Sequence, residues 1–250
     1  MEDPENELLK RMAAHRSVRE FTEEPVSERD VRRAVEAAEM ASTSSWIQAY
    51  SLIQITDREE RHALRQLCGD QPQVEQAGAF FCVCGDSHRH QQIAEDAGAN
   101  YEPNLETFLL AVVDASLFAQ NLALAFESLG YGICFIGGLR NRLPEVDAKL
   151  ELPNGVLPLF GLCVGSPAAS EEARAPRPRL PVEAVWTKNR YWDPAELREH
   201  LHAMDVDAGR HYAARGLAGR NWTGGIWRKF KKASREHLLA FYESKGARLR

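Results

Sequence analysis

The stretch His15-Arg16-Ser17-Val18-Arg19 places two guanidinium groups and one hydroxyl within five residues, directly after a short helical pattern. Each arginine presents several N–H donors in a planar fork that suits a phosphate, and the serine can add a donor. Hydrogen bonds to a charged group contribute about 1.5 to 3 kcal/mol each, so a few of them hold a phosphomonoester. A solvated basic turn at a helix end has the same local sequence, so the interpretation depends on the rest of the chain.

The composition is that of a chain with one sizeable core and an acidic balance. Of 250 residues, 44% are hydrophobic, which is enough for one large α/β domain or for a domain with a smaller appendage. The net charge of -5 argues against general nucleic-acid binding, so a small anionic ligand needs a local basic site. We expect a cytoplasmic protein without a nucleic-acid partner.

The cysteines lie mostly in apolar runs, without C-x-x-C spacing, and are five in number: Cys68, Cys82, Cys84, Cys134 and Cys163. This pattern predicts free thiols in a reducing compartment. No H-E-x-x-H motif and no paired Cys/His quartet is present, so no metal is expected. The polar, acidic start of the sequence lacks a charged-then-apolar signal pattern, which also favours the cytoplasm.

An apolar run over residues 105–129 raises the question of a membrane span. Asp114, Gln120, Asn121 and Glu127 inside it make that placement costly. A long helix in a protein core or at a dimer interface is the preferred interpretation, with no membrane association.

Apolar periodicity predicts helices over residues 5–14, 27–40, 58–67, 105–129, 194–215 and 227–245. Runs rich in β-branched or aromatic residues predict strands over residues 50–56, 79–85, 132–136 and 158–165. This alternation indicates an α/β or α+β fold in which helices dominate.

The composition changes after residue 165, which divides the chain into a core over residues 1–165 and an extension over residues 166–250. Four prolines between 167 and 181 predict an extended arm rather than a packed element. Residues 208–235 carry eight basic and no acidic side chains. This basic tract is either a solvated helix face or a binding site for a polyanionic small molecule.

The chain has no G-x-x-x-x-G-K-S/T loop and no G-x-G-x-x-G turn opening a helix, so neither a P-loop enzyme nor a Rossmann dehydrogenase is supported. Four other elements can build a site: residues 15–19, a hydroxyl cluster at 42–45 followed by Trp46, residues 136–141 and residues 177–181. Paired glycines at a strand end, at 137 and 138, let backbone N–H groups approach a flat ligand, although such a pair alone is more often a turn.

In this order and spacing the four elements resemble the oxygen-insensitive NADPH nitroreductase and NADPH-flavin oxidoreductase family, in its NADPH-preferring branch. T-S-S-W-I-Q at 43–48, V-V-D at 112–114, E-S-L-G-Y-G at 127–132 and L-P-L-F-G-L-C-V-G at 157–165 extend the resemblance along nearly the whole chain. The ordered set is far more specific than any single piece.

The resemblance implies a homodimeric α+β fold with three α/β/α layers, a small and mostly antiparallel sheet, and long helices at the subunit interface. It also implies two FMN sites shared between the subunits and a C-terminal helical extension that wraps the partner.

The same resemblance implies the residues of the site. The FMN phosphate is expected to bind to segment 15–19, including His15 and Val18, and to Arg179 beside Pro178. The ribityl chain and ring edge are expected to contact Thr43, Ser44 and Gln71. The backbone near the flavin N5 is expected to come from Phe135, Ile136, Gly137 and Gly138. Arg177 is expected beside N1 and O2. Residues expected at the NADPH or substrate side are Trp46, Glu106, Arg140, Arg215 and Arg220.

Several positions depart from the family pattern. Arg177 stands where lysine is usual, which keeps the charge but spreads it over a planar fork. Thr43 interrupts a serine run, Trp46 stands for phenylalanine and Phe135 for tyrosine. The last two changes bear on substrate preference more than on the cofactor.

The function that follows from the resemblance is two-electron, ping-pong reduction of nitroaromatics, quinones or flavins with NADPH, with no catalytic side chain because the flavin carries the chemistry. Three alternatives stay open: a relative with another acceptor, such as a flavin reductase serving a monooxygenase, a flavin- or phosphate-binding regulatory protein without turnover, and an interaction module built on the basic tract.

Overall fold

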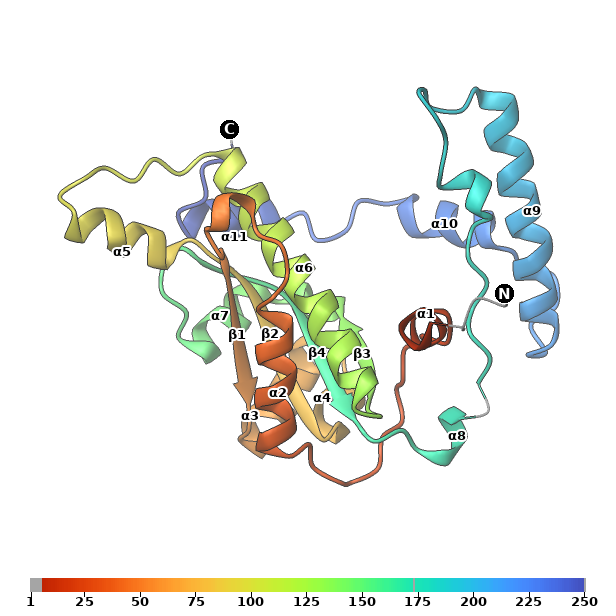
Figure 1. Ribbon diagram of the computed structural model, residues 1–250, viewed down its shortest axis with the longest axis horizontal. Coiled ribbons are helices and arrows are strands. Elements are labelled where there is room, and N and C mark those ends of the chain that lie inside the picture. The colour runs from red at the N-terminus through yellow and green to blue at the C-terminus, as the bar shows by residue number, and fades with distance from the viewer. Residues whose placement is uncertain (1–5, 173, 250) are drawn as a thin grey trace. The chain divides into compact units, whose positions relative to one another are not determined.

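The computed structural model describes residues 6–172 and 174–249. They form two compact units (Figure 1): unit 1 comprises Met1–Arg174 and Arg235–Arg250, and unit 2 comprises Ala175–Ser234. The division of the sequence at 165/166 stays a prediction.

Unit 1 is built on one antiparallel sheet. Its strands β1 (Tyr50–Ile55), β2 (Ala79–Asp86), β3 (Gly132–Ile136) and β4 (Val156–Gly165) lie in the order β1-β2-β4-β3. Every residue of β2 is buried, since the strand is central and both of its faces are covered. Its side chains alternate between two hydrophobic clusters, Phe81 and Val83 in one and Phe80 and Cys82 in the other.

One face of the sheet is covered by α2 (Glu28–Ala38), α6 (Leu105–Ser128) and α11 (Leu238–Ser244). The Asn104 side chain and Thr107 form a capping box that starts α6. Among the described residues, α6 alone is long and apolar enough to cross a membrane by length and composition. Its buried residues, Phe118, Leu122 and Phe126 among them, pack in this cluster, as expected for a core helix.

The opposite face is covered by α3 (Arg58–Leu67), α4 (Gln73–Gln76), α7 (Leu143–Leu150) and the 3-10 turn η2 (Gly137–Asn141). All five cysteines are buried in this second cluster and unpaired. The layers are therefore helix, sheet and helix, which confirms the α+β prediction. The remaining elements of unit 1 are α1 (Glu7–Ala13), η1 (Ser44–Trp46), α5 (His88–Asp96) and α8 (Ala169–Glu172).

Unit 2 contains an extended arm, η3 (Val182–Ala184), α9 (Pro194–Ala213) and α10 (Trp222–Phe230). Asp205 of α9 accepts hydrogen bonds from the backbone N–H and the hydroxyl of Thr223, at 2.8 and 2.5 Å, and so fastens the start of α10. The predicted helix over 227–245 is wrong. Arg235 takes a left-handed φ of 58°, which a continuous helix does not allow, and α10 and α11 are separate.

Candidate functional site

Segment 15–19 lies along the edge of the sheet, beside the first residues of β3. The Val18 N–H donates to the Ile133 carbonyl at 2.9 Å, in a parallel bridge between Ser17 and Ile133. A Cβ on Gly132 would lie 2.6 Å from the Val18 side chain, so glycine is needed for this approach. The backbone of the segment is therefore fixed by the sheet.

The charged groups of the segment each have a defined partner. Arg16 Nε donates to the Glu171 carbonyl at 3.2 Å, and an Arg19 guanidinium N–H donates to the Ser17 carbonyl at 3.1 Å. His15 Nδ1 lies 2.6 Å from Glu127 Oε1. Arg16 is half-buried and Arg19 is exposed, so both forks retain N–H groups in reach of a ligand.

The hydroxyl loop is held by a carboxylate of α6. Asp114 is fully buried, and its two oxygens accept the backbone N–H groups of Ser44 and Ala49 at 3.0 and 3.1 Å. Between them, Ser45 and Trp46 have positive φ values of 46° and 61°. The loop thus presents Trp46 with 84% of its surface exposed, on strained backbone that a buried anchor stabilises.

The paired glycines after β3 lie against Gln71. A Cβ on Gly138 would collide with the Cys68 carbonyl and the Gln71 amide, whereas one on Gly137 would meet only Arg140, at 3.5 Å. Gln71 Nε2 donates to the Cys68 carbonyl at 2.8 Å. Backbone at Gly137 is therefore open on one side, next to a fixed amide, which is the geometry that a flat ligand requires.

The other predicted residues of unit 1 lie on either side of the paired glycines, except for Glu106 in α6, and they differ in environment. Phe135 is 37% exposed and stacks edge-on against Phe160, while Ile136 is buried. Arg140 donates to the Leu159 carbonyl, and Glu106 is exposed in the first turn of α6. Their contact with a substrate stays a prediction.

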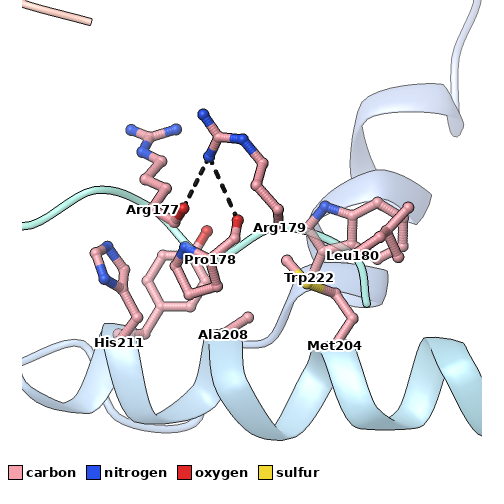
Figure 2. Close-up of a pocket in the computed structure, with 9 residues that line it drawn as sticks. Arg177, Pro178, Arg179, Leu180, Met204, Ala208, His211 and Trp222 are labelled. Carbon is pink, nitrogen blue, oxygen red and sulfur yellow. Dashed lines mark hydrogen bonds between the residues drawn. The ribbon is translucent and has the colours of Figure 1, made fainter. Parts of the chain in front are cut away.

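In unit 2, the arm carrying Arg177 and Arg179 has two faces. Both arginines are exposed, whereas Pro178 and Leu180 between and after them are half-buried. Figure 2 shows the two guanidinium groups on the side of the arm away from α9. Arg179 donates to the Arg177 carbonyl at 2.8 Å, which holds the turn between them.

A hollow of about 340 Å³ separates the arm from α9 and α10. Its apolar part is lined by Leu180, Met204, Ala208 and Trp222, and its polar rim includes His211 (Figure 2). The Nε2 atom of His211 is buried without a hydrogen-bond partner among the described residues. Sequence analysis missed this hollow, because its walls are separated by up to 45 positions along the chain.

Arg215 and Arg220 are exposed in the connection between α9 and α10. Two glycines at positive φ, Gly216 at 71° and Gly219 at 81°, shape this connection. The basic tract thus runs from the last turns of α9 through this loop and α10 to the residues after it, and is not one helix face.

The structure places Gln71 against Gly138, next to Gly137, and fixes segment 15–19 at the edge strand that leads into the two glycines. It places Arg177, Arg179, Arg215 and Arg220 in the other unit, so their convergence with segment 15–19 stays a prediction. The anchoring roles of Asp114 and Glu171 were not foreseen. For Asp114, the available sequence signal was an aspartate inside an apolar helix. No sequence pattern marked Glu171.

The buried thiols do not provide a nucleophile. Burial raises the pKa of Cys68 to about 12, and burial likewise raises the pKa of Cys134 and Cys163 above the usual thiol value. The thiolate form is therefore scarce at neutral pH. Within the described residues, no group of three or more His, Cys, Asp or Glu side chains is arranged for a metal ion.

Comparison with known proteins agrees with this geometry. The nitroreductase family model matches residues 12–166, and the model of the nitroreductase family C-terminal domain matches residues 177–250. The chain is 39% identical over 247 residues to the FMN reductase (NADPH) of Bacillus subtilis, with 96% of this chain and 98% of that protein covered. It is 41% identical over 246 residues to the oxygen-insensitive NADPH nitroreductase of Salmonella typhimurium, with 97% and 98% covered.

The solved structure of NfrA1 from B. megaterium superposes with a TM-score of 0.93 at 40% identity and covers 97% of this chain and 99% of that one. The matches extend over both units and nearly the full length of each relative. The chain therefore belongs to the nitroreductase family.

Proposed function

We propose that this protein is an FMN-dependent oxidoreductase that uses NADPH to reduce nitroaromatics, quinones or flavins. The observation that carries the proposal is the pairing, within unit 1, of a cationic segment fixed to the sheet edge with open glycine backbone beside Gln71. The first suits a phosphate and the second a flat ring. The names of the related enzymes, an FMN reductase and an NADPH nitroreductase, support the same chemistry.

The residues present fit FMN. Arg16, Ser17 and Arg19 offer fork and hydroxyl donors for the phosphate dianion. Gln71 offers an amide for the ring. Gly137 offers uncovered backbone, because a glycine has no Cβ to stand in front of its peptide groups. Thr43 and Ser44 sit in the loop anchored by Asp114 and supply hydroxyls for the ribityl chain.

FMN, when bound, supplies the two-electron redox chemistry. The chain holds and orients it and admits one substrate at a time, which explains why no acid-base pair is assigned. Arg177 is assigned to the N1 and O2 edge, where a fixed cation stabilises negative charge in a partly dry site. Phe135 is assigned to the flavin near N5, and Trp46, Glu106 and Arg140 are assigned to the substrate side.

We assign the NADPH 2'-phosphate to Arg215 and Arg220. Both are exposed in a glycine-containing loop within the basic tract, which itself has no acidic residue. A phosphate that distinguishes NADPH from NADH needs such donors.

We also assign a homodimer in the cytoplasm. The exposed side of α6 carries Leu105, Leu109, Val113 and Leu117, spaced four residues apart and each 44 to 51% exposed. A continuous apolar stripe of this kind marks a protein interface. Five buried, unpaired thiols suit a reducing compartment.

One spectroscopic experiment tests the proposal. The protein as purified is expected to be yellow, and one anaerobic addition of NADPH is expected to bleach it within the mixing time. Subsequent addition of a quinone is then expected to restore the yellow colour. A yellow protein that NADPH does not bleach would identify a flavin-binding protein without turnover, and a colourless protein that takes up no FMN would exclude the proposal.

A further inference from the structure

We infer that Glu171 is a positioning residue for the phosphate-binding segment 15–19. Its carboxylate fixes the backbone at Arg19, and its carbonyl group holds the Arg16 guanidinium. One side chain and its own backbone therefore set the spacing between the two cations that receive the phosphate. The inference rests on the proposed function, in which this segment binds the FMN phosphate.

The carboxylate is buried where a charge is costly. Glu171 has no exposed surface, and its Oε1 accepts the Arg19 backbone N–H at 3.0 Å and an Arg174 guanidinium N–H at 2.8 Å. Its Oε2 has no donor among the described residues. Burying a carboxylate in which one oxygen accepts no hydrogen bond destabilises a fold. Packing alone therefore gives no reason for a glutamate at this position.

The hydrogen-bond pattern around the segment shows what the carboxylate does. The Val18 N–H donates to the Ile133 carbonyl of β3, and the Thr22 N–H donates to the Ser166 carbonyl after β4, both at 2.9 Å. The Arg19 N–H, one residue after Val18, donates to the Glu171 carboxylate. Glu171 thus supplies a side-chain acceptor for the backbone at the residue that carries the second cation.

Residues next to Glu171 also contact Glu20, the residue that follows Arg19. Arg174 makes an ion pair with Glu20 at 3.1 Å, and the Ser170 hydroxyl donates to the other oxygen of Glu20 at 2.6 Å. The short helix α8 is thereby tied to the residue that follows Arg19. These contacts do not involve Gln71, Gly137 or Gly138, so Glu171 is expected to act on the phosphate end of the cofactor and not on its ring.

The test compares two flavins that differ only in the phosphate. Full-length wild type, Glu171→Ala and Glu171→Gln are freed of flavin, and the dissociation constants of FMN and riboflavin are measured by quenching of flavin fluorescence. An unsatisfied N–H in Glu171→Ala is expected to weaken FMN binding roughly tenfold while riboflavin binding stays within about twofold. Glu171→Gln, whose amide oxygen still accepts the Arg19 N–H, is expected to recover most of the loss.

Glu23→Ala is the matched control, because it removes an exposed carboxylate from the same stretch of chain. It is expected to leave both constants unchanged. A similar loss of FMN affinity in the control would show that the effect is not specific to Glu171 and would overturn the inference. Equal weakening of FMN and riboflavin in Glu171→Ala, or no weakening, would overturn it as well.

Hydrogen exchange separates this inference from the proposed function. In the flavin-free chain, peptides covering residues 17–21 are expected to exchange faster in Glu171→Ala than in wild type, while peptides of β2 are unchanged. If wild type binds FMN and riboflavin equally tightly, the phosphate assignment of segment 15–19 fails, yet faster exchange still supports the anchor. Unchanged exchange overturns the anchor whatever the flavin results show.

Discussion

Gly138 is the glycine of unit 1 at which an added methyl group is expected to lower the stability of the fold most. Its Cβ would collide with the Cys68 carbonyl and the Gln71 amide, and the carbonyl belongs to a backbone that does not yield. We expect Gly138→Ala to lower the free energy of unfolding of the flavin-free protein by about 1 to 3 kcal/mol in urea titrations. Gly137→Ala, where the added methyl is in ordinary contact at 3.5 Å, is the control and should change it by less than about 0.5 kcal/mol.

Arg215 and Arg220 are the residues expected to separate NADPH from NADH. Replacing both by alanine removes the donors assigned to the 2'-phosphate, so the ratio of kcat/KM for NADPH over NADH should fall by about 10-fold or more. Steady-state kinetics with the two donors and one quinone measure it. Lys188→Ala, at an exposed cation of the same unit, is the control, and an unchanged ratio in the double variant would refute the assignment.

At the scale of elements, the pairing of β1 with β2 depends on a charged side chain at its end. Asp86 is 4% exposed and accepts hydrogen bonds from Ser51, Arg89 and the His88 N–H. Burial alone would raise its pKa, but the Ser51 hydrogen bond and the Arg89 charge outweigh it and hold the pKa below the ordinary value.

A carboxyl whose pKa is lowered in the folded state stabilises the protein above the unfolded-state pKa, about 3.9 for aspartate. That contribution is lost as the pH falls through the folded-state value. Asp86→Asn is therefore expected to destabilise the protein by about 1 to 3 kcal/mol at pH 7 and by less near pH 3, in urea titrations at both values. Asp96→Asn, at an exposed carboxylate of α5, controls for charge; an equal loss at both pH values would contradict the argument.

The strands and helices around the second cluster protect every thiol of the chain. All five cysteines are buried, and in Cys82 the hydrogen bond with Cys84 and burial both raise the pKa. We expect no reaction with Ellman's reagent over minutes in the native protein and five reactive thiols in denaturant. Ala97→Cys, which adds an exposed thiol after α5, should react at once and shows that the reagent is competent.

Elements with strong local patterns were predictable from the sequence, and those decided by distant contacts were not. The helix Arg58–Leu67 and the strand Gly132–Ile136 have the predicted bounds, because apolar periodicity and flanking glycines mark them. The break before α11 was missed, since the Arg235 side chain is held by Asn141, 94 positions away. The Asp114 and Glu171 anchors were missed for the same reason.

For the whole molecule, the exposed stripe on α6 is the surface that we expect to decide the oligomeric state. Leu109→Glu combined with Val113→Glu places two charges in it, and burying them in an interface is costly. Sedimentation equilibrium is expected to give twice the chain mass of 28.1 kDa for wild type and a single chain mass for the variant. Met40→Glu, at an 83% exposed side chain after α2, should remain dimeric. A wild type that sediments as one chain would refute the assignment.

The last sixteen residues return to unit 1 after the chain has built unit 2. Tyr242 donates to the Pro158 carbonyl at 2.9 Å, and the buried Lys245 pairs with Asp147 at 2.8 Å. Unit 2 is thus an insertion with both ends secured. A single proteolytic cut between residues 185 and 193 therefore leaves two fragments that remain associated without a covalent link. A stop codon after Ser234, by contrast, removes part of the hydrophobic core of unit 1.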